Sequence, residues 1–127
     1  PRNPNRHRSS DTLTPAQRRG KHIFEREFDN AGNTLGPDQR CISCHSGPYF
    51  TNREKFSVGT ASELDTHDVF DVPHLNNIYE SAPYLHDGRA ETLEEIWTRF
   101  NPNDEHGVTN DMTKDQLNDL IEYLKTL

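Results

Sequence analysis

The only two cysteines of this sequence fall in one five-residue motif, Cys41-Ile42-Ser43-Cys44-His45. Two thiols at this spacing fit on one short helical turn, and the histidine that follows projects its imidazole from the same turn. The pattern C-x-x-C-H is the attachment signature of c-type haem, in which Cys41 and Cys44 form thioethers with the porphyrin edge. His45 is then the proximal ligand of the iron. The motif therefore predicts one covalently bound haem c.

Three other interpretations of the motif compete with haem. A thioredoxin-like dithiol needs a βαβ pattern nearby, and the flanking sequence has none. A structural zinc site needs four ligands, so the thiols would recruit two of His67, His74, His86 and His106, but no His pair at zinc-finger spacing follows. A plain disulfide gives the adjacent histidine no purpose. Haem uses every residue of the motif and is the favoured interpretation.

The composition agrees with a bound cofactor. Only 30% of the 127 residues are hydrophobic, well below the usual apolar share of about 45–50%. A single domain of this length with so few apolar side chains needs a disulfide, a metal or a cofactor to complete its interior. The net charge of −7 argues against a nucleic-acid partner. No apolar run approaches the ~20 residues that a membrane-spanning helix requires.

The charge is unevenly distributed along the chain. Residues 1–26 hold seven basic and two acidic side chains, a net of +5, and the remainder carries −12. Residues 1–12 are rich in Pro, Asn, Arg and Ser without apolar periodicity, which predicts a basic linker or arm. Residues 13–127 are expected to form the haem domain. Its acidic body would steer a basic redox partner, an attraction that salt weakens.

Three stretches have helical periodicity, and each opens with a threonine that can cap a helix. Thr14, Thr92 and Thr113 each precede a Gln or Glu by three positions, as a capping box requires. The three apolar stripes are Ala16, Gly20, Ile23, Phe24 and Phe28; Leu93, Ile96, Trp97 and Phe100; and Leu117, Leu120, Ile121, Leu124 and Leu127. Residues 29–90 are rich in Gly, Pro, Asn and Asp and show no convincing strand. The sequence thus predicts an all-α fold of three main helices, with long loops around the haem.

The sequence resembles the c-type cytochromes of the bacterial di-haem peroxidase group, which includes cytochrome c peroxidases and MauG-type enzymes. The resemblance runs from about Leu13 to Leu127, and APYLHDGR at 82–89 is its most specific part. Its other carriers are LTPAQRRG at 13–20, CISCHSGPYFT at 41–51, VPHLNNI at 72–78, TLEE at 92–95 and DLIEYLKTL at 119–127. It implies a small cytochrome c domain over residues 13–127 that matches the C-terminal haem domain of such proteins. Covalent haem attachment implies a periplasmic or equivalent location.

The resemblance has further implications. The first and last helices would cross closely through Gly20, Phe24 and Tyr123. The N-terminal haem domain of such proteins would be a partner that the basic arm joins. The related proteins also hold calcium between their two domains, and the matching backbone carbonyls here belong to Ser81 and Pro83.

The sixth iron ligand decides between an electron carrier and a catalyst. The resemblance implies a Met or Tyr after the TLEE motif, but Phe100 stands at that position and cannot bind iron. His106 is the first replacement, because it precedes the last helix at a distance similar to that of the axial Met of small c-type cytochromes. Met112 and His86 are the next candidates, and a solvent-exposed loop residue is the alternative for His106.

Two functions remain open at this stage. A six-coordinate iron makes the chain an electron-transfer module, with a partner protein or domain supplying or accepting electrons. An open iron makes it a haem peroxidase or oxygenase, and Phe100 in place of a ligand favours this alternative. In either case Arg89, within the APYLHDGR stretch, is expected to pair with the haem propionates through charge-assisted hydrogen bonds.

Overall fold

Helices carry most of the regular structure between residues 12 and 127, the part of the chain that this computed structural model describes. The predicted basic arm lies outside the described residues except for Thr12. The four α-helices are α1 (Pro15–Phe24), α2 (Cys41–Cys44), α3 (Leu93–Thr98) and α4 (Lys114–Leu124). Two short 3₁₀ helices, η2 (Pro37–Gln39) and η3 (Ile78–Glu80), lie in the long connections. None of the helices described within residues 12–127 is long and apolar enough to span a membrane.

A small sheet also forms in the long central segment. Strands β1 (Lys55–Phe56) and β2 (Phe70–Asp71) pair antiparallel, with Lys55 opposite Asp71. The prediction of a fold without strands is thus wrong in this detail. Each strand has only two residues, which is too short for the alternating pattern that reveals a strand in sequence.

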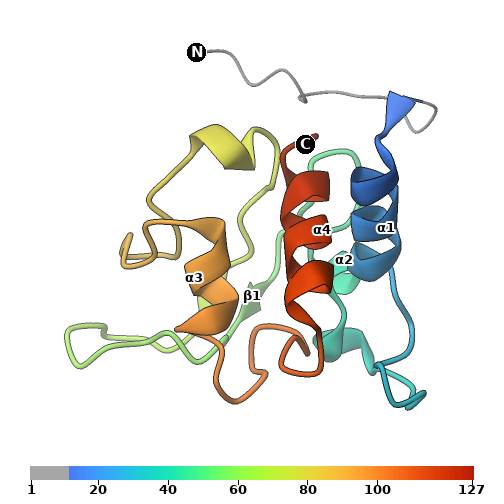
Figure 1. Ribbon diagram of the computed structural model, residues 1–127. Coiled ribbons are helices and arrows are strands. Elements are labelled where there is room, and N and C mark those ends of the chain that lie inside the picture. The colour runs from blue at the N-terminus through green and yellow to red at the C-terminus, as the bar shows by residue number, and fades with distance from the viewer. Residues whose placement is uncertain (1–11) are drawn as a thin grey trace.

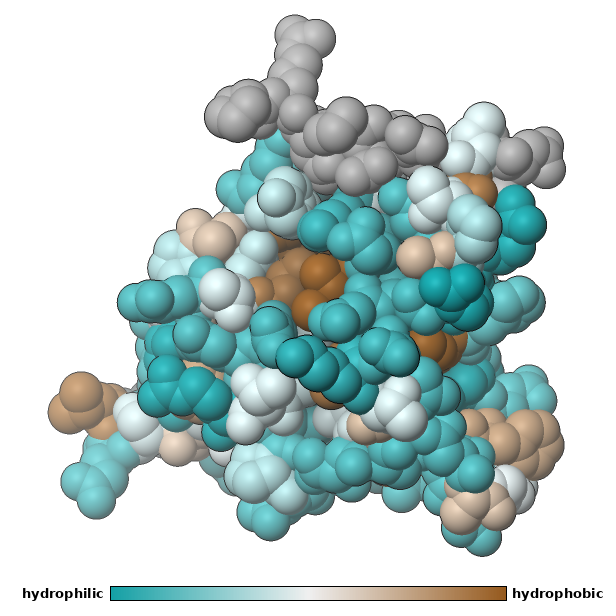
Figure 2. Space-filling view, viewed as in Figure 1, coloured by the Kyte–Doolittle hydropathy of each residue, from teal (hydrophilic) through white to brown (hydrophobic). Residues whose placement is uncertain are grey.

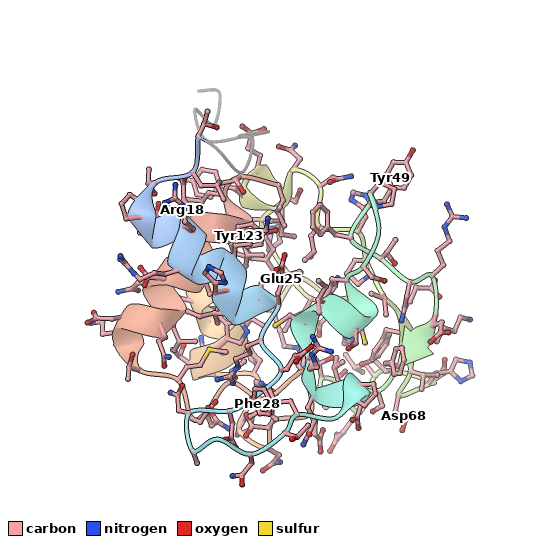
Figure 3. All side chains as sticks on the ribbon, turned by 90° about the vertical axis from the view of Figure 1, so that its right-hand side faces the viewer. Arg18, Glu25, Phe28, Tyr49, Asp68 and Tyr123 are labelled. Atoms are coloured by element: carbon pink, nitrogen blue, oxygen red, sulfur yellow. The ribbon has the colours of Figure 1, made fainter. Side chains whose placement is uncertain are left out.

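Helices α1 and α4 lie side by side (Figure 1), and they pack closely at Gly20. A Cβ atom at Gly20 would overlap the backbone carbonyl of Asp119 and would lie 2.8 Å from the Cβ of Tyr123. Beyond the crossing, the rings of Phe24 and Tyr123 pack with centroids 5.5 Å apart. Figure 3 shows the two helices from the side, with Tyr123 labelled. The close approach expected at Gly20, Phe24 and Tyr123 is confirmed.

The capping signals largely form as predicted. Thr14 and Gln17 make a complete capping box at α1, and Thr113 and Gln116 make one at α4. At α3 the hydroxyl of Thr92 accepts a hydrogen bond from the backbone N–H of the third residue of the helix, Glu95. The reciprocal bond is missing there, because the carboxylate of Glu95 accepts from the backbone N–H of Glu91 instead.

Two helices end earlier than their apolar stripes suggest. Helix α1 ends at Phe24, so Phe28 lies outside it and is 54% exposed. The guanidinium of Arg40 donates to the backbone carbonyls of Glu25 and Arg26, which satisfies carbonyl groups just beyond the helix end. Helix α3 likewise ends at Thr98, two residues before Phe100.

The core lies between α1, α3 and α4. Its buried members include Phe24, Leu93, Leu120 and Tyr123, and a second group of apolar side chains, only partly buried, packs against them. This second group is Ile23, Cys41, Ile42, Phe50, Leu75, Ile78, Leu85, Trp97, Phe100, Leu117 and Ile121. Figure 2 shows hydrophobic side chains gathered in a recess of the face framed by α3 and α4. The apolar side chains of this second group thus remain partly exposed beside the core.

Candidate haem site

Helix α2 is a single turn that carries both cysteines of the motif, one at each end. Cys41 and Cys44 are free thiols, so the sulfurs are not consumed in a disulfide. Burial raises the pKa of the Cys41 thiol to about 11, and burial also raises the pKa of Cys44. Both groups are therefore protonated thiols at neutral pH. Neutral thiols on one turn match the chemistry of thioether formation, in which S–H adds across a vinyl group.

His45 directly follows α2, and its imidazole is held by the backbone of two other segments. Its Nδ1 donates to the carbonyl oxygens of Phe50, at 3.0 Å, and of Pro73, at 3.1 Å. These acceptors fix the tautomer with the proton on Nδ1, which leaves the lone pair of Nε2 available for a metal. Burial lowers the pKa of His45, so the ring is neutral at pH 7. This is the arrangement that a proximal haem ligand requires.

His106 lies across from His45, although the two residues are far apart in sequence. Their ring centroids are 6.5 Å apart and their planes are inclined by 38°. Imidazole nitrogens bind metals at about 2 Å, so two rings on opposite sides of one metal have centres roughly 6 Å apart. The spacing of His45 and His106 therefore fits two axial ligands of one iron.

The environment of His106 also fits a ligand. Its Nδ1 is buried without a hydrogen-bond partner, and the ring is only partly exposed, which argues against an ordinary surface residue. Burial, together with the nearby His45, lowers the pKa of His106 to about 4. Both imidazoles are thus neutral at physiological pH, and a neutral imidazole has the nitrogen lone pair that binding to iron requires.

The other candidate ligands are engaged elsewhere. Met112 is buried in the core cluster. His86 stacks on the ring of Phe70 at 3.8 Å, and its Nε2 lies 3.0 Å from a carboxylate oxygen of Asp65. Phe100 contributes a partly buried ring beneath the guanidinium of Arg99. The structure therefore brings His106, rather than Met112 or His86, next to His45.

The zinc alternative has no matching cluster. Across residues 12–127, no group of three or more His, Cys, Asp or Glu side chains is arranged to hold a metal ion. His67 is exposed, and His74 lies at the rim of a shallow surface hollow with Tyr49, which projects away from the body of the molecule (Figure 3). A tetrahedral zinc site with four protein ligands is not formed by these residues. Haem, which supplies four nitrogens of its own, needs only the two axial side chains.

Arg89 is paired within its own motif. Its Nε donates to a carboxylate oxygen of Asp87 at 2.8 Å, and its Nη2 contacts the same carboxylate. The guanidinium also lies 5.9 Å from the centre of the Phe100 ring, so Arg89 borders the half-buried apolar group around the core. Ser81, one of the two residues matched to a calcium site, uses its hydroxyl to donate to the carbonyl of Asn77.

Two side chains that hold the loop carrying His106 have no signal in the sequence. From the sequence, Asn101 is interpretable only as a helix stop before Pro102. In the structure its buried amide makes hydrogen bonds with the backbone of His106 and Gly107. Arg26 clamps the same loop through the carboxylate of Asp111, at 2.7 Å, and the carbonyl of Val108. Neither contact has a local sequence signal, because each depends on how a loop closes.

Comparisons with known proteins find two curated relatives of this chain. It is 33% identical over 91% of its length to the gamma subunit of hydrazine synthase from Kuenenia stuttgartiensis. It is 32% identical over 76% of its length to a cytochrome c551 peroxidase from Nitrosomonas europaea. No protein-family model matches the sequence.

Solved structures show the same relationship. A structure of Kuenenia stuttgartiensis hydrazine synthase superposes with a TM-score of 0.76 at 30% identity, over 98% of this chain and 49% of that one. A MauG-like protein associated with microbial copper homeostasis superposes with a TM-score of 0.66 over 91% of this chain and 44% of that one. At 21% identity, this second match shows the fold alone. The chain spans 42% and 33% of the two curated relatives, which are thus larger proteins.

Proposed function

We propose that this chain, a relative of the MauG and di-haem peroxidase-type cytochromes, is an electron-transfer domain with one haem c. Haem binding follows from the cytochrome c-type relatives and from the motif of α2. The finer assignment rests on one observation, the opposed imidazoles of His45 and His106 with ring centroids 6.5 Å apart. In this assignment Cys41 and Cys44 would attach the porphyrin, and His45 and His106 would hold the iron.

When bound, haem iron supplies a one-electron couple between its ferric and ferrous states. The residues of this chain determine how that couple operates. The carbonyls of Phe50 and Pro73 accept the Nδ1 proton of His45, which orients the ring and increases its basicity. If His106 also bound the iron, it would take the position that peroxide or oxygen would otherwise use. Burial lowers the pKa of both imidazoles, so at pH 7 each ring is neutral and would offer an unprotonated nitrogen to the iron.

Several further assignments belong to the same proposal. We place the domain outside the cytoplasmic membrane, where thioether attachment of haem occurs. Its partner is a redox protein or a further domain of the kind that the larger relatives contain. Arg89 is assigned to a haem propionate, since its Nη1 makes no hydrogen bond within the described residues. A calcium ion at the carbonyls of Ser81 and Pro83 is assigned to the interface with such a domain.

One observation favours a second function, a haem peroxidase or oxygenase. The imidazole of His45 has two backbone acceptors, whereas Nδ1 of His106 has no partner. A ring held by no hydrogen bond of its own is easier to displace from iron than one held by two. A displaced His106 would leave an open site and an acid–base group beside it.

Visible absorption of the holoprotein distinguishes the two functions. For an electron carrier we expect low-spin spectra in both oxidation states and no reaction of the reduced protein with carbon monoxide. His106→Ala should convert the iron to high spin and allow carbon monoxide to bind, whereas His67→Ala, at an exposed histidine, should leave the spectra unchanged. A low-spin spectrum in His106→Ala would show that another residue is the ligand. A high-spin wild-type protein would favour the peroxidase.

A further inference from the structure

Asn101 occupies an unusual place for a polar side chain. It lies three residues after the end of α3 and is 1% exposed, among the most deeply buried side chains described. A buried amide is costly unless its donors and acceptor are paired. The three residues that bond this amide, His106, Gly107 and Thr109, all lie in the loop that carries His106. The burial of Asn101 and the shape of that loop therefore depend on each other.

The contacts of Asn101 enclose His106 from both sides along the backbone. Its Oδ1 accepts from the N–H of His106 at 2.8 Å, and its Nδ2 donates to the carbonyl of Gly107 at 3.0 Å. The same Nδ2 contacts the hydroxyl of Thr109 at 2.9 Å and the carbonyl of His106 at 3.4 Å. One side chain thus holds the peptide groups before and after the Cα of His106.

We propose that Asn101 is the positioning residue of the distal histidine, fixing the backbone of His106 so that its ring faces His45. The imidazole of His106 has no hydrogen bond at Nδ1 to orient it. Its direction therefore depends on the backbone to which it is attached, and the backbone at this point is bonded to Asn101. The inference rests on the proposed function, in which His106 is an iron ligand.

Other contacts anchor the loop without touching the peptide groups of His106. The backbone N–H of Val108 donates to the carbonyl of Gln39 at 3.0 Å, and Arg26 donates to the carbonyl of Val108. The loop would thus stay in place if the Asn101 amide were lost. Loss of the amide would instead change the orientation of the His106 ring, and hence how firmly His106 would bind the iron.

Asn110 provides a matched control within the same loop. Its Nδ2 donates to the backbone carbonyls of Asn101 and Pro102, at 3.1 and 3.0 Å. It closes the loop as Asn101 does, but none of its described bonds reaches the peptide groups of His106. Asn110→Ala therefore reproduces a loss of loop bonds without removing the positioning contact.

The test measures how fast cyanide binds to the ferric holoprotein, together with the low-spin EPR signal, well below the unfolding temperature. Asn101→Ala should raise the cyanide rate at least about tenfold and broaden or split the low-spin signal, as loss of a ligand's outer partner does. Asn110→Ala should stay within about twofold of wild type. Asn101→Asp retains an acceptor for the N–H of His106 and should bind cyanide more slowly than Asn101→Ala.

Because Asn101→Ala removes every bond of a buried amide, Thr109→Val serves as a milder second variant, with a smaller rise in the same direction. The proposal would be overturned if Asn101→Ala and Asn110→Ala bound cyanide at equal rates. If Asn101→Ala does not fold, a wild-type cyanide rate in Thr109→Val would overturn it. His106→Ala separates the two levels of inference. If it leaves the cyanide rate unchanged, His106 is not a ligand and the proposed function has failed. If it opens the iron while Asn101→Ala behaves as wild type, only the role of Asn101 has failed.

Discussion

Replacing Gly20 by Ala tests whether the α1–α4 crossing holds the domain together. An added Cβ would overlap the carbonyl of Asp119 and lie 2.8 Å from the Cβ of Tyr123. Neither atom belongs to the far end of a flexible side chain, so the helices themselves must separate. Helix propensity alone predicts the opposite sign, because Ala is favoured over Gly by up to ~1 kcal/mol inside a helix.

The size of the effect follows from what the crossing buries. Overpacking a well-filled contact costs about 1–3 kcal/mol. Separation also exposes part of Phe24, Leu120 and Tyr123, which are 3%, 1% and 6% exposed. Full burial of such a side chain contributes about 1.5–3 kcal/mol, so losing a third of it at three residues costs roughly 1.5–3 kcal/mol more. After subtracting the helix-propensity gain of up to ~1 kcal/mol, we expect a net destabilisation of about 1.5–5 kcal/mol.

The assay is urea unfolding of the holoprotein followed by far-UV circular dichroism. The same signal followed on heating should show a midpoint of thermal unfolding lowered by roughly 5–15 °C for a domain of this length. Gly36→Ala is the matched control, because its φ of −71° suits any residue and an added Cβ would meet only the ends of the Asp38 and Gln39 side chains. If Gly20→Ala proved neutral or stabilising, the close crossing could not be what requires glycine at this position.

Two further perturbations test the electrostatics and the core. The guanidinium of Arg26 holds the pKa of Asp111 below its usual value, so the stabilisation from Asp111 is complete above a pH of about 4 and is lost as the pH falls through the lower folded pKa. Asp111→Asn should therefore lower the unfolding free energy by about 2 kcal/mol at pH 6. This loss should shrink towards pH 3 in urea titrations. A loss that did not change with pH would contradict a charge-dependent bond between Asp111 and Arg26. Leu120→Ala, at a side chain 1% exposed, should cost about 2–5 kcal/mol. Leu64→Ala, at a side chain 95% exposed, should change the unfolding free energy by less than ~0.5 kcal/mol, and equal losses would show that burial does not govern stability here.

The features that sequence predicted well are those that neighbouring residues determine. The turn of α2 with its two thiols, and the caps at Thr14 and Thr113, depend on residues within three or four positions. Phe28 was expected on the buried stripe of the first helix, and its exposure could not be foreseen. The helix ends four residues earlier, where Arg40 from a distant segment satisfies backbone carbonyls.

The candidate site divides in the same way. His45 is recognisable from the motif, but its acceptors at Phe50 and Pro73 come from separate loops. The spacing of His106 before the last helix suggested a ligand, whereas only the fold shows it opposite His45. Asn101 had no signal, because an asparagine before proline commonly ends a helix and its amide contacts exist only after the loop has closed.

The contacts that build the site differ in how far along the chain they reach. On the distal side, the bonds of Asn101, Asp104 and Asn110 join residues no more than nine positions apart. Closing so short a segment carries a small entropic cost, and such contacts form early in folding. On the proximal side, His45 depends on Pro73, which lies 28 positions away. The bonds inside the loop of His106 can therefore form locally, whereas the bonds of that loop to Arg26 and Gln39, and the bond of His45 to Pro73, form only when distant segments pack together.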